Sequence, residues 1–169
     1  CPVPFAHWSR VPIPCLEQAI ESRFACGGQW TMPAPLKLQL SGSNSPPVTF
    51  PMPGGQQEAE MSRVRAASAP SPFGHGNQTV VDQTVRKAHQ LMPDQFVLSG
   101  GFDGVIPAHI LDKVRKELVP DAGAITAKLH KINVYENGGF FTDHKDTPRS
   151  ETHFGSLVLL LPAFHTGGA

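Results

Sequence analysis

The sequence predicts an α+β fold in which β-structure predominates. Residues 1–72 are dense in proline, serine and glycine, two later stretches have apolar residues at helical spacing, and the chain after Asp121 consists of short segments rich in β-branched and aromatic residues. Short strands separated by turn residues indicate sheet, and the helices are expected to pack against it. At 169 residues the chain is long enough for one domain or part of one.

In the first 72 residues the candidate strands are "PLKLQL" and "PVTF". The turn-forming runs "SGSNSPP" and "PMPGGQQ" separate them from their neighbours. We expect this region to consist of extended segments joined by exposed loops.

A first helix is predicted from Thr79 to Leu91. Val81, Val85, Ala88 and Leu91 fall at helical spacing, and Thr79 with Asp82 resembles an N-terminal capping box. Pro93 would end this helix.

A second helix is predicted from Pro107 to Leu118. Proline is tolerated in the first turn, and Pro120 follows the expected end. One face would carry the apolar residues Ile110, Leu111, Val114 and Leu118.

After Asp121 three strands are predicted, in "AITAKLHKINVY", "GFFTDHKD" and "GSLVLLL". Gly138 and Gly139 lie between the first two. We expect them to form a hairpin turn whose backbone requires positive φ angles.

Composition narrows the classes of partner. Lysine plus arginine equal aspartate plus glutamate at 14 each, so no net field favours nucleic acid or an acidic membrane surface. The longest apolar run, residues 157–164, falls well short of the roughly 20 residues of a membrane-spanning helix. Small molecules or a particular protein surface are the expected partners. The three cysteines, expected to be reduced thiols, are Cys1, Cys15 and Cys26.

His144 and Asp146 are the candidate metal ligands. If residues 140–146 are extended, the two-residue period of a strand places both side chains on one face, with Lys145 on the other. An imidazole and a carboxylate with open coordination positions suit a non-haem Fe(II) oxygenase. Taken alone, H-x-D is a weak signal, because the triplet is common by chance and its usual setting is a solvated loop or a hydrogen-bonded His–Asp pair.

The surrounding sequence, "KINVYENGGFFTDHKDTPRSETHFGSLVLLLPAFHTGG", resembles the start of the catalytic core of prolyl 4-hydroxylase-like 2-oxoglutarate/Fe(II)-dependent dioxygenases. The resemblance is closest to a subgroup with an H-x-DTPR motif followed by an F-G-S-L-V strand. It covers residues 128–168, and residues 69–88 and 24–28 look like supporting segments.

The resemblance implies a double-stranded β-helix, the jelly roll shared with cupins. Residues 1–126 would be an N-terminal supporting region, and residues 127–169 the first strands of the core. It implies an enzyme that uses Fe(II), 2-oxoglutarate and O2 to hydroxylate an unknown substrate, for which a protein is one candidate, with release of succinate and CO2.

By the same resemblance, His144 and Asp146 would bind iron and Tyr135 would line the 2-oxoglutarate pocket. A second histidine and a basic anchor for 2-oxoglutarate are expected after residue 169. We therefore expect the jelly roll to be incomplete at the C-terminus and the chain alone to be inactive. Its first residue, Cys1, and its last residues, "HTGGA", indicate a piece of a longer protein.

Several alternatives remain open. Tyr135 suits a core or interface aromatic equally well, Thr147 and Arg149 suit a loop anchor, and His153 and His165 are expected to be turn imidazoles. A non-catalytic jelly-roll binding module and a cupin-type protein with three or more histidine ligands are the rival functions. The compartment is open, with cytoplasm or nucleus favoured.

Overall fold

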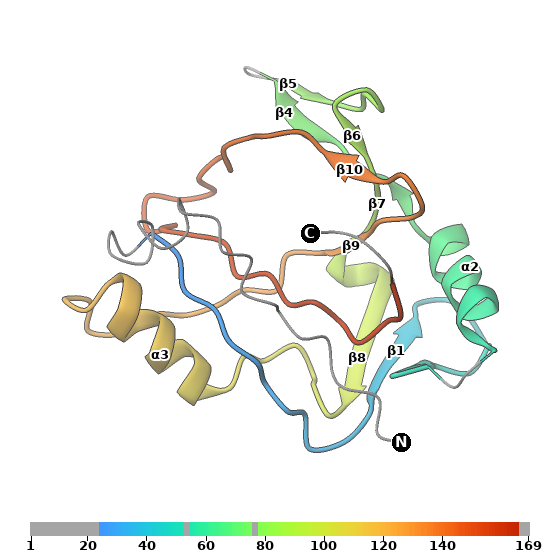
Figure 1. The fold of residues 1–169 in the computed structure, drawn as a ribbon, viewed down its shortest axis with the longest axis horizontal. Helices are drawn as coiled ribbons and strands as arrows, with labels where there is room; N and C mark the ends of the chain where they lie inside the picture. Colours follow the sequence, from blue (N-terminus) through green and yellow to red (C-terminus); the bar gives the residue numbers. More distant parts are fainter. Residues whose placement is uncertain (1–23, 53–54, 76–77, 166–169) are drawn as a thin grey trace.

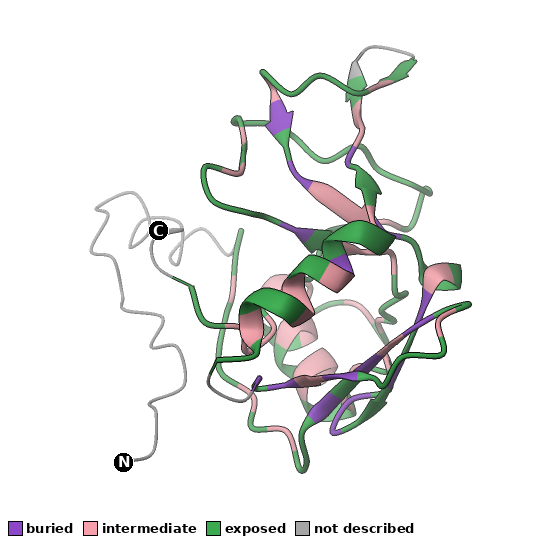
Figure 2. Ribbon diagram, turned by 90° about the vertical axis from the view of Figure 1, so that its right-hand side faces the viewer, coloured by how far each residue is buried: buried purple, intermediate pink, exposed green. Residues whose placement is uncertain are grey.

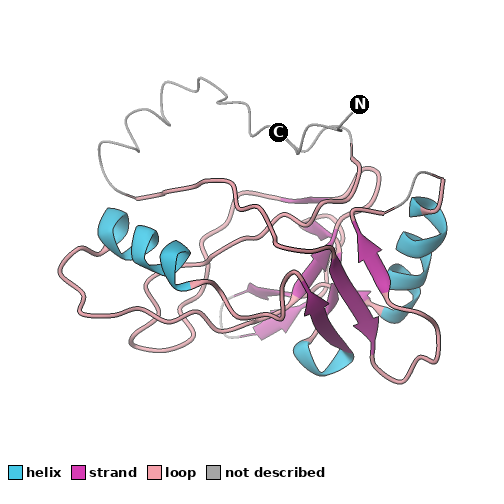
Figure 3. Cartoon of the chain, turned by 90° about the horizontal axis from the view of Figure 1, so that it is seen from below, coloured by secondary structure: helices cyan, strands magenta, loops and turns pink. Residues whose placement is uncertain are grey.

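The structure is a computed structural model that describes residues 24–52, 55–75 and 78–165 (Figure 1). Their strands form four small antiparallel sheets, accompanied by two α-helices and one short 3-10 helix, η1 (Pro93–Gln95). The helices lie on opposite sides of the strands (Figures 1 and 3). The predicted mixed and mainly β architecture is confirmed. The predictions for Cys1 and Cys15 lie outside the described residues.

The central sheet has the strand order β2-β1-β8, from β1 (Leu36–Leu40), β2 (Val48–Phe50) and β8 (Phe96–Gly100). Alternate residues of β1 are buried, and directly opposite partners such as Leu38 and Val48, or Leu40 and Phe96, share the buried face. Period-two burial is the expected pattern for a sheet with one face on the core. The strands predicted in "PLKLQL" and "PVTF" are confirmed.

The chain leaves β8 through a close approach to the segment before β1. The Gly101 amide donates to the carbonyl of Pro35 at 3.1 Å. A Cβ atom on Gly101 would lie 1.9 Å from the carbonyl oxygen of Ala34, which is backbone and cannot rotate away. Only glycine fits this position.

The second three-stranded sheet has the order β3-β7-β9, from β3 (Ala69–Pro70), β7 (His89–Leu91) and β9 (Ile132–Val134). Beside it lie two pairs of strands. One joins β10 (Phe140–Phe141) to β6 (Arg86–Lys87), and the other joins β4 (Phe73–His75) to β5 (Gln78–Val80). Strands from both sides of residue 126 therefore share sheets.

In the turn between β9 and β10 the predicted positive φ is confirmed for Gly138, at 66°, but not for Gly139, whose amide donates to the Glu136 carbonyl at 2.7 Å. This turn does not close a hairpin. β9 pairs with β7, whereas β10 pairs with β6.

The predicted helix over residues 79–91 is wrong. Its first residues form β5, its last residues form β6 and β7, and Asp82 instead caps a turn by accepting hydrogen bonds from the Thr84 amide and hydroxyl at 2.8 and 2.7 Å. These bonds lower the pKa of the Asp82 carboxyl. An aspartate that bonds its own backbone two residues on competes with a helix, and a run of β-branched residues favours strands.

Helix α2 (Gln57–Ala67) lies where extended chain was expected. Its residues are mostly strong helix formers, with Glu58 and Glu60 in the first turn and Arg65 in the last, as the helix dipole favours. Val64 is its one buried residue, so the apolar stripe that usually identifies a helix is weak.

Helix α3 (Ala108–Leu118) confirms the second predicted helix, with Pro107 as its N-cap. None of its residues is fully buried, and the apolar face is half-buried (Figure 2). The main core lies instead between the central sheet, α2 and the second sheet, and its buried members include Leu36, Val64, Leu91 and Val134. Among the described residues, neither helix has the length and apolar character needed to cross a bilayer.

The strand predicted in "GSLVLLL" is not formed, because residues 155–161 pair with no strand in the described part of the chain. A strand requires a partner for its backbone groups. The apolar side chains of residues 157–160 are exposed, with Val158 at 81%, and Leu161 is partly buried against the core.

Candidate metal site

The H-x-D motif lies in the loop that follows β10. The prediction that residues 140–146 form one extended strand is wrong beyond Phe141, where β10 ends, although the Thr142 amide still donates to the Val85 carbonyl at 3.0 Å. The chain then bends at Asp143. The loop conformation, and not strand alternation, brings the two candidate ligands together.

His144 is oriented by its own loop. Its Nδ1 lies 2.9 Å from the carbonyl oxygen of Thr142. A carbonyl only accepts hydrogen bonds, so Nδ1 carries the proton, and in the neutral ring Nε2 keeps its lone pair. Nε2 lies 3.6 Å from Oδ1 of Asp146. Both side chains are about half exposed, at 41% and 52%.

Asp146 is held by the other end of the loop. The Ser156 hydroxyl donates to its Oδ2 at 2.5 Å. This hydrogen bond, followed by electrostatic interactions with His144 and Arg149, lowers the pKa of the Asp146 carboxyl. The carboxylate is therefore ionised at neutral pH, with Oδ1 directed at His144 and Oδ2 at Ser156.

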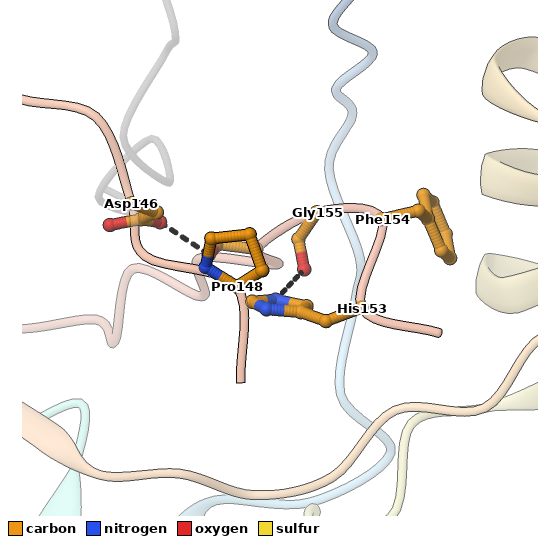
Figure 4. A pocket seen from close by; sticks show the side chains of 6 residues that line it. Asp146, Pro148, His153, Phe154 and Gly155 are labelled. Carbon is orange, nitrogen blue, oxygen red and sulfur yellow. Dashed lines mark hydrogen bonds between the residues drawn. The ribbon is translucent and has the colours of Figure 1, made fainter. Parts of the chain in front are cut away.

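An open pocket of about 200 Å³ lies beside Asp146. The loop itself forms its walls, through Pro148, His153, Phe154 and Ser156. Figure 4 shows Asp146 at one side of this pocket and His153 at another. A small molecule could therefore reach the carboxylate from solvent.

Neither local histidine joins the pair. His153 accepts from the Arg149 amide through Nδ1 at 3.0 Å and donates through Nε2 to the Gly155 carbonyl at 2.7 Å, so both its nitrogens are engaged. His165 donates through Nδ1 to the Ala163 carbonyl at 3.0 Å. Within residues 24–52, 55–75 and 78–165, no group of three or more His, Cys, Asp or Glu side chains is arranged to hold a metal ion.

Tyr135 directly follows β9, and its side chain is about half exposed. In the described part of the chain it hydrogen-bonds to neither His144 nor Asp146. The structure thus brings together two of the three predicted site residues.

Two basic residues near the site had not been assigned a role from the sequence. Burial, followed by the charges of Arg86 and Arg149, lowers the pKa of Lys131. Burial, followed by the charges of Arg149 and Lys131, lowers the pKa of His130. The charge of Asp146 acts in the opposite direction and raises the pKa of both Lys131 and His130. Both side chains therefore lie within electrostatic range of the Asp146 carboxylate.

Sequence reasoning also missed Ser156, which holds the carboxylate, and Phe141, which stacks on His144. Ser156 belongs to the F-G-S run and Phe141 lies three positions before the histidine. Both were therefore present in the motif, but nothing in their spacing indicated contact.

Comparisons with protein-family models, with curated proteins and with solved structures find no match to this chain. The donor set itself partly fits a divalent ion. An imidazole nitrogen with a free lone pair and an ionised carboxylate oxygen lie 3.6 Å apart, within reach of one ion at metal–ligand distances of about 2 Å.

Proposed function

We propose that this chain carries the metal-binding part of a 2-oxoglutarate- and Fe(II)-dependent dioxygenase that hydroxylates a substrate with release of succinate and CO2. The observation that carries the proposal is the convergence of His144 Nε2 and Asp146 Oδ1 on one open side of a loop. The H-x-DTPR resemblance supplies the choice of iron and co-substrate.

The alternative is an ordinary ion pair in an exposed loop. Such pairs contribute about 0–1 kcal/mol to stability and form without additional hydrogen bonds that hold each partner in place. Here each partner is held separately, His144 by the Thr142 carbonyl and Asp146 by the Ser156 hydroxyl. Metal-ligating histidines usually donate their other ring N–H to a carbonyl or carboxylate, and ligating carboxylates are themselves hydrogen-bonded.

In the proposed enzyme, His144 and Asp146 supply two protein ligands. The protein's contribution is to hold these atoms in place, leave the remaining coordination positions open, and admit small molecules through the pocket beside Asp146. Bound Fe(II) with 2-oxoglutarate would supply the activation of O2. Tyr135 is proposed to line the co-substrate pocket, a role for which the resemblance is the support.

The finer fold belongs to the same proposal. We infer that the small antiparallel sheets are the first part of a double-stranded β-helix. The exposed apolar side chains of residues 157–160, which pair with no strand in the described part of the chain, support the inference.

Metal binding by the chain tests the site directly. Mn(II) is a paramagnetic substitute for Fe(II), and titrating it into ¹⁵N-labelled protein should broaden the amide resonances around residues 143–147 and 156 first. His144→Ala and Asp146→Asn should each abolish this selective broadening. Because two protein ligands leave the ion largely hydrated, we expect weak binding.

Asp143→Asn is the matched control, since Asp143 is an exposed aspartate in the same loop. This variant should keep the broadening pattern. If broadening is centred elsewhere, or survives in Asp146→Asn, the pair is not a metal site, and the non-catalytic binding module becomes the better account. Sub-micromolar binding that is lost in His165→Ala would instead favour a cupin-type site with a further histidine.

A further inference from the structure

We infer that Arg86 and Phe141 are positioning residues for His144, holding its imidazole so that Nε2 faces Asp146. The inference rests on the proposed function for the meaning of that orientation. The orientation itself is a property of the metal-free chain and is open to measurement there.

The three side chains form a stack. The Phe141 and His144 rings are nearly parallel, with an interplanar angle of 22° and centroids 3.6 Å apart. The Arg86 guanidinium carbon lies 4.4 Å from the Phe141 centroid. Two groups this close to one ring cannot share a face without overlap, so Phe141 is sandwiched between the guanidinium and the imidazole.

The pairing of β6 with β10 brings the side chains of this stack together. Arg86 in β6 and Phe141 in β10 are directly opposite each other in the antiparallel register. Directly opposite residues project to the same side, with Cβ atoms about 4.5–5.5 Å apart. The arginine thus meets the aromatic ring because of the backbone register, and the short loop after β10 returns His144 to the other face of the ring.

Arg86 is itself fixed and is only 6% exposed. One guanidinium nitrogen donates to the Pro72 carbonyl at 3.0 Å and the other to Asn133 Oδ1 at 2.9 Å. Among the residues that the structure describes, no carboxylate forms an ion pair with Arg86, and its buried Nε has no hydrogen-bond partner. A buried charge without a carboxylate lowers stability, so this arrangement is not explained by stability alone.

The stack complements the hydrogen bond from Nδ1. That bond defines which nitrogen carries the proton, and the Phe141 face defines the plane of the ring. An exposed histidine would otherwise sample several rotamers. Together the two restraints direct Nε2 at Asp146 before any ligand arrives, and loss of such supporting contacts typically weakens metal binding by about 10–100-fold.

The test compares Phe141→Leu, which removes the ring, with Phe141→Tyr, which restores it. In metal-free protein the carbon-bound protons of His144 should be shifted upfield by the Phe141 ring current. Phe141→Leu should return them to values of an unstructured histidine and weaken Mn(II) binding by about 10–100-fold. Phe141→Tyr should restore both, and Arg86→Met should reproduce part of the loss.

Phe140 and Lys87 give a matched control, because they form the neighbouring pair in the same two strands. Phe140→Leu and Lys87→Met should leave the His144 shifts and the Mn(II) affinity unchanged. The inference is overturned if Phe141→Leu leaves the His144 shifts as they are in the parent chain, or if the shifts collapse while Mn(II) affinity stays the same. Absence of Mn(II) binding at His144 in the unmutated chain would overturn the proposed function, whereas the metal-free shifts still decide whether the stack orients the ring.

Discussion

Single residues at the candidate site are held by hydrogen bonds that begin and end within one loop. Thr142 orients His144 from two residues away, and Ser156 reaches Asp146 from ten residues away. Because each partner has its own restraint, their effects are separable by mutation.

The Ser156 hydroxyl is expected to control the acidity of Asp146. Ser156→Ala removes the largest contribution to the lowered pKa, so the carboxyl pKa should rise toward its ordinary value of about 3.9. Titration of the Asp146 side-chain carbon by NMR measures this. Ser150→Ala is the control, because that hydroxyl bonds to Thr152 and not to Asp146. An unchanged pKa in Ser156→Ala would contradict the assigned contact.

His130 is expected to make stability depend on pH near neutrality. Its pKa is lower in the folded chain than the unfolded value of about 6.5, so the unfolded chain takes up this proton first as pH falls. The stability contribution is complete above about pH 6.5 and is lost as pH falls toward the folded pKa. In urea unfolding experiments, the free energy of unfolding of His130→Gln should depend less on pH between pH 8 and pH 5 than that of the parent chain.

The pH 8 measurement serves as the reference for that comparison. Both the folded and unfolded chains are then neutral at His130, so any difference between variant and parent reflects lost packing. A parallel offset at every pH would show that titration of His130 does not contribute.

At the level of elements, sequence periodicity identified those that carry a clear apolar pattern of their own. β1, β2 and α3 were predicted because each carries a clear two-residue or helical apolar pattern. The helix prediction for residues 79–91 failed because a helical spacing of apolar residues coincided with strands, of which β6 and β7 pair with partners far along the chain. No local pattern reports that Arg86 pairs with Phe141.

The candidate site was predicted only in part for the same reason. The predicted proximity of His144 and Asp146 is present in the structure, although a loop and not a strand brings them together. Their supporting contacts with Phe141, Arg86 and Ser156 depend on strand register and on the path of a loop. Neither property is encoded in residue spacing.

The exit from β8 is expected to tolerate no side chain larger than hydrogen. Gly101→Ala would drive a Cβ against the Ala34 backbone, and we expect a loss of at least about 2 kcal/mol in the free energy of unfolding. Gly123→Ala is the control, since nothing lies within 4 Å of the added atom. It should change stability by less than about 0.5 kcal/mol. Equal effects of the two substitutions would show that the close approach is absent.

For the molecule as a whole, stability depends on one core beneath the central sheet. Leu38 is 1% exposed and belongs to this core, so Leu38→Ala should cost about 2–5 kcal/mol. Val97→Ala, on the exposed face of β8, should cost less than about 1 kcal/mol. Denaturant unfolding followed by tryptophan fluorescence measures both. A similar cost at the two positions would contradict the one-sided burial of the sheet.

The pairing of β1 with β8 also determines when the central sheet can form during translation. Leu36 leaves the ribosome 64 residues before its partner Gly100, an interval of roughly 3–13 s at about 5–20 residues per second. During that time the nascent β1–β2 pair exposes its leucine side chains to solvent. Chaperone binding and misassembly are expected in this interval, before β8 covers the strand edge. Arrest-peptide fusions of increasing length should register folding force only after β8 has emerged; force from the β1–β2 pair alone would refute this order.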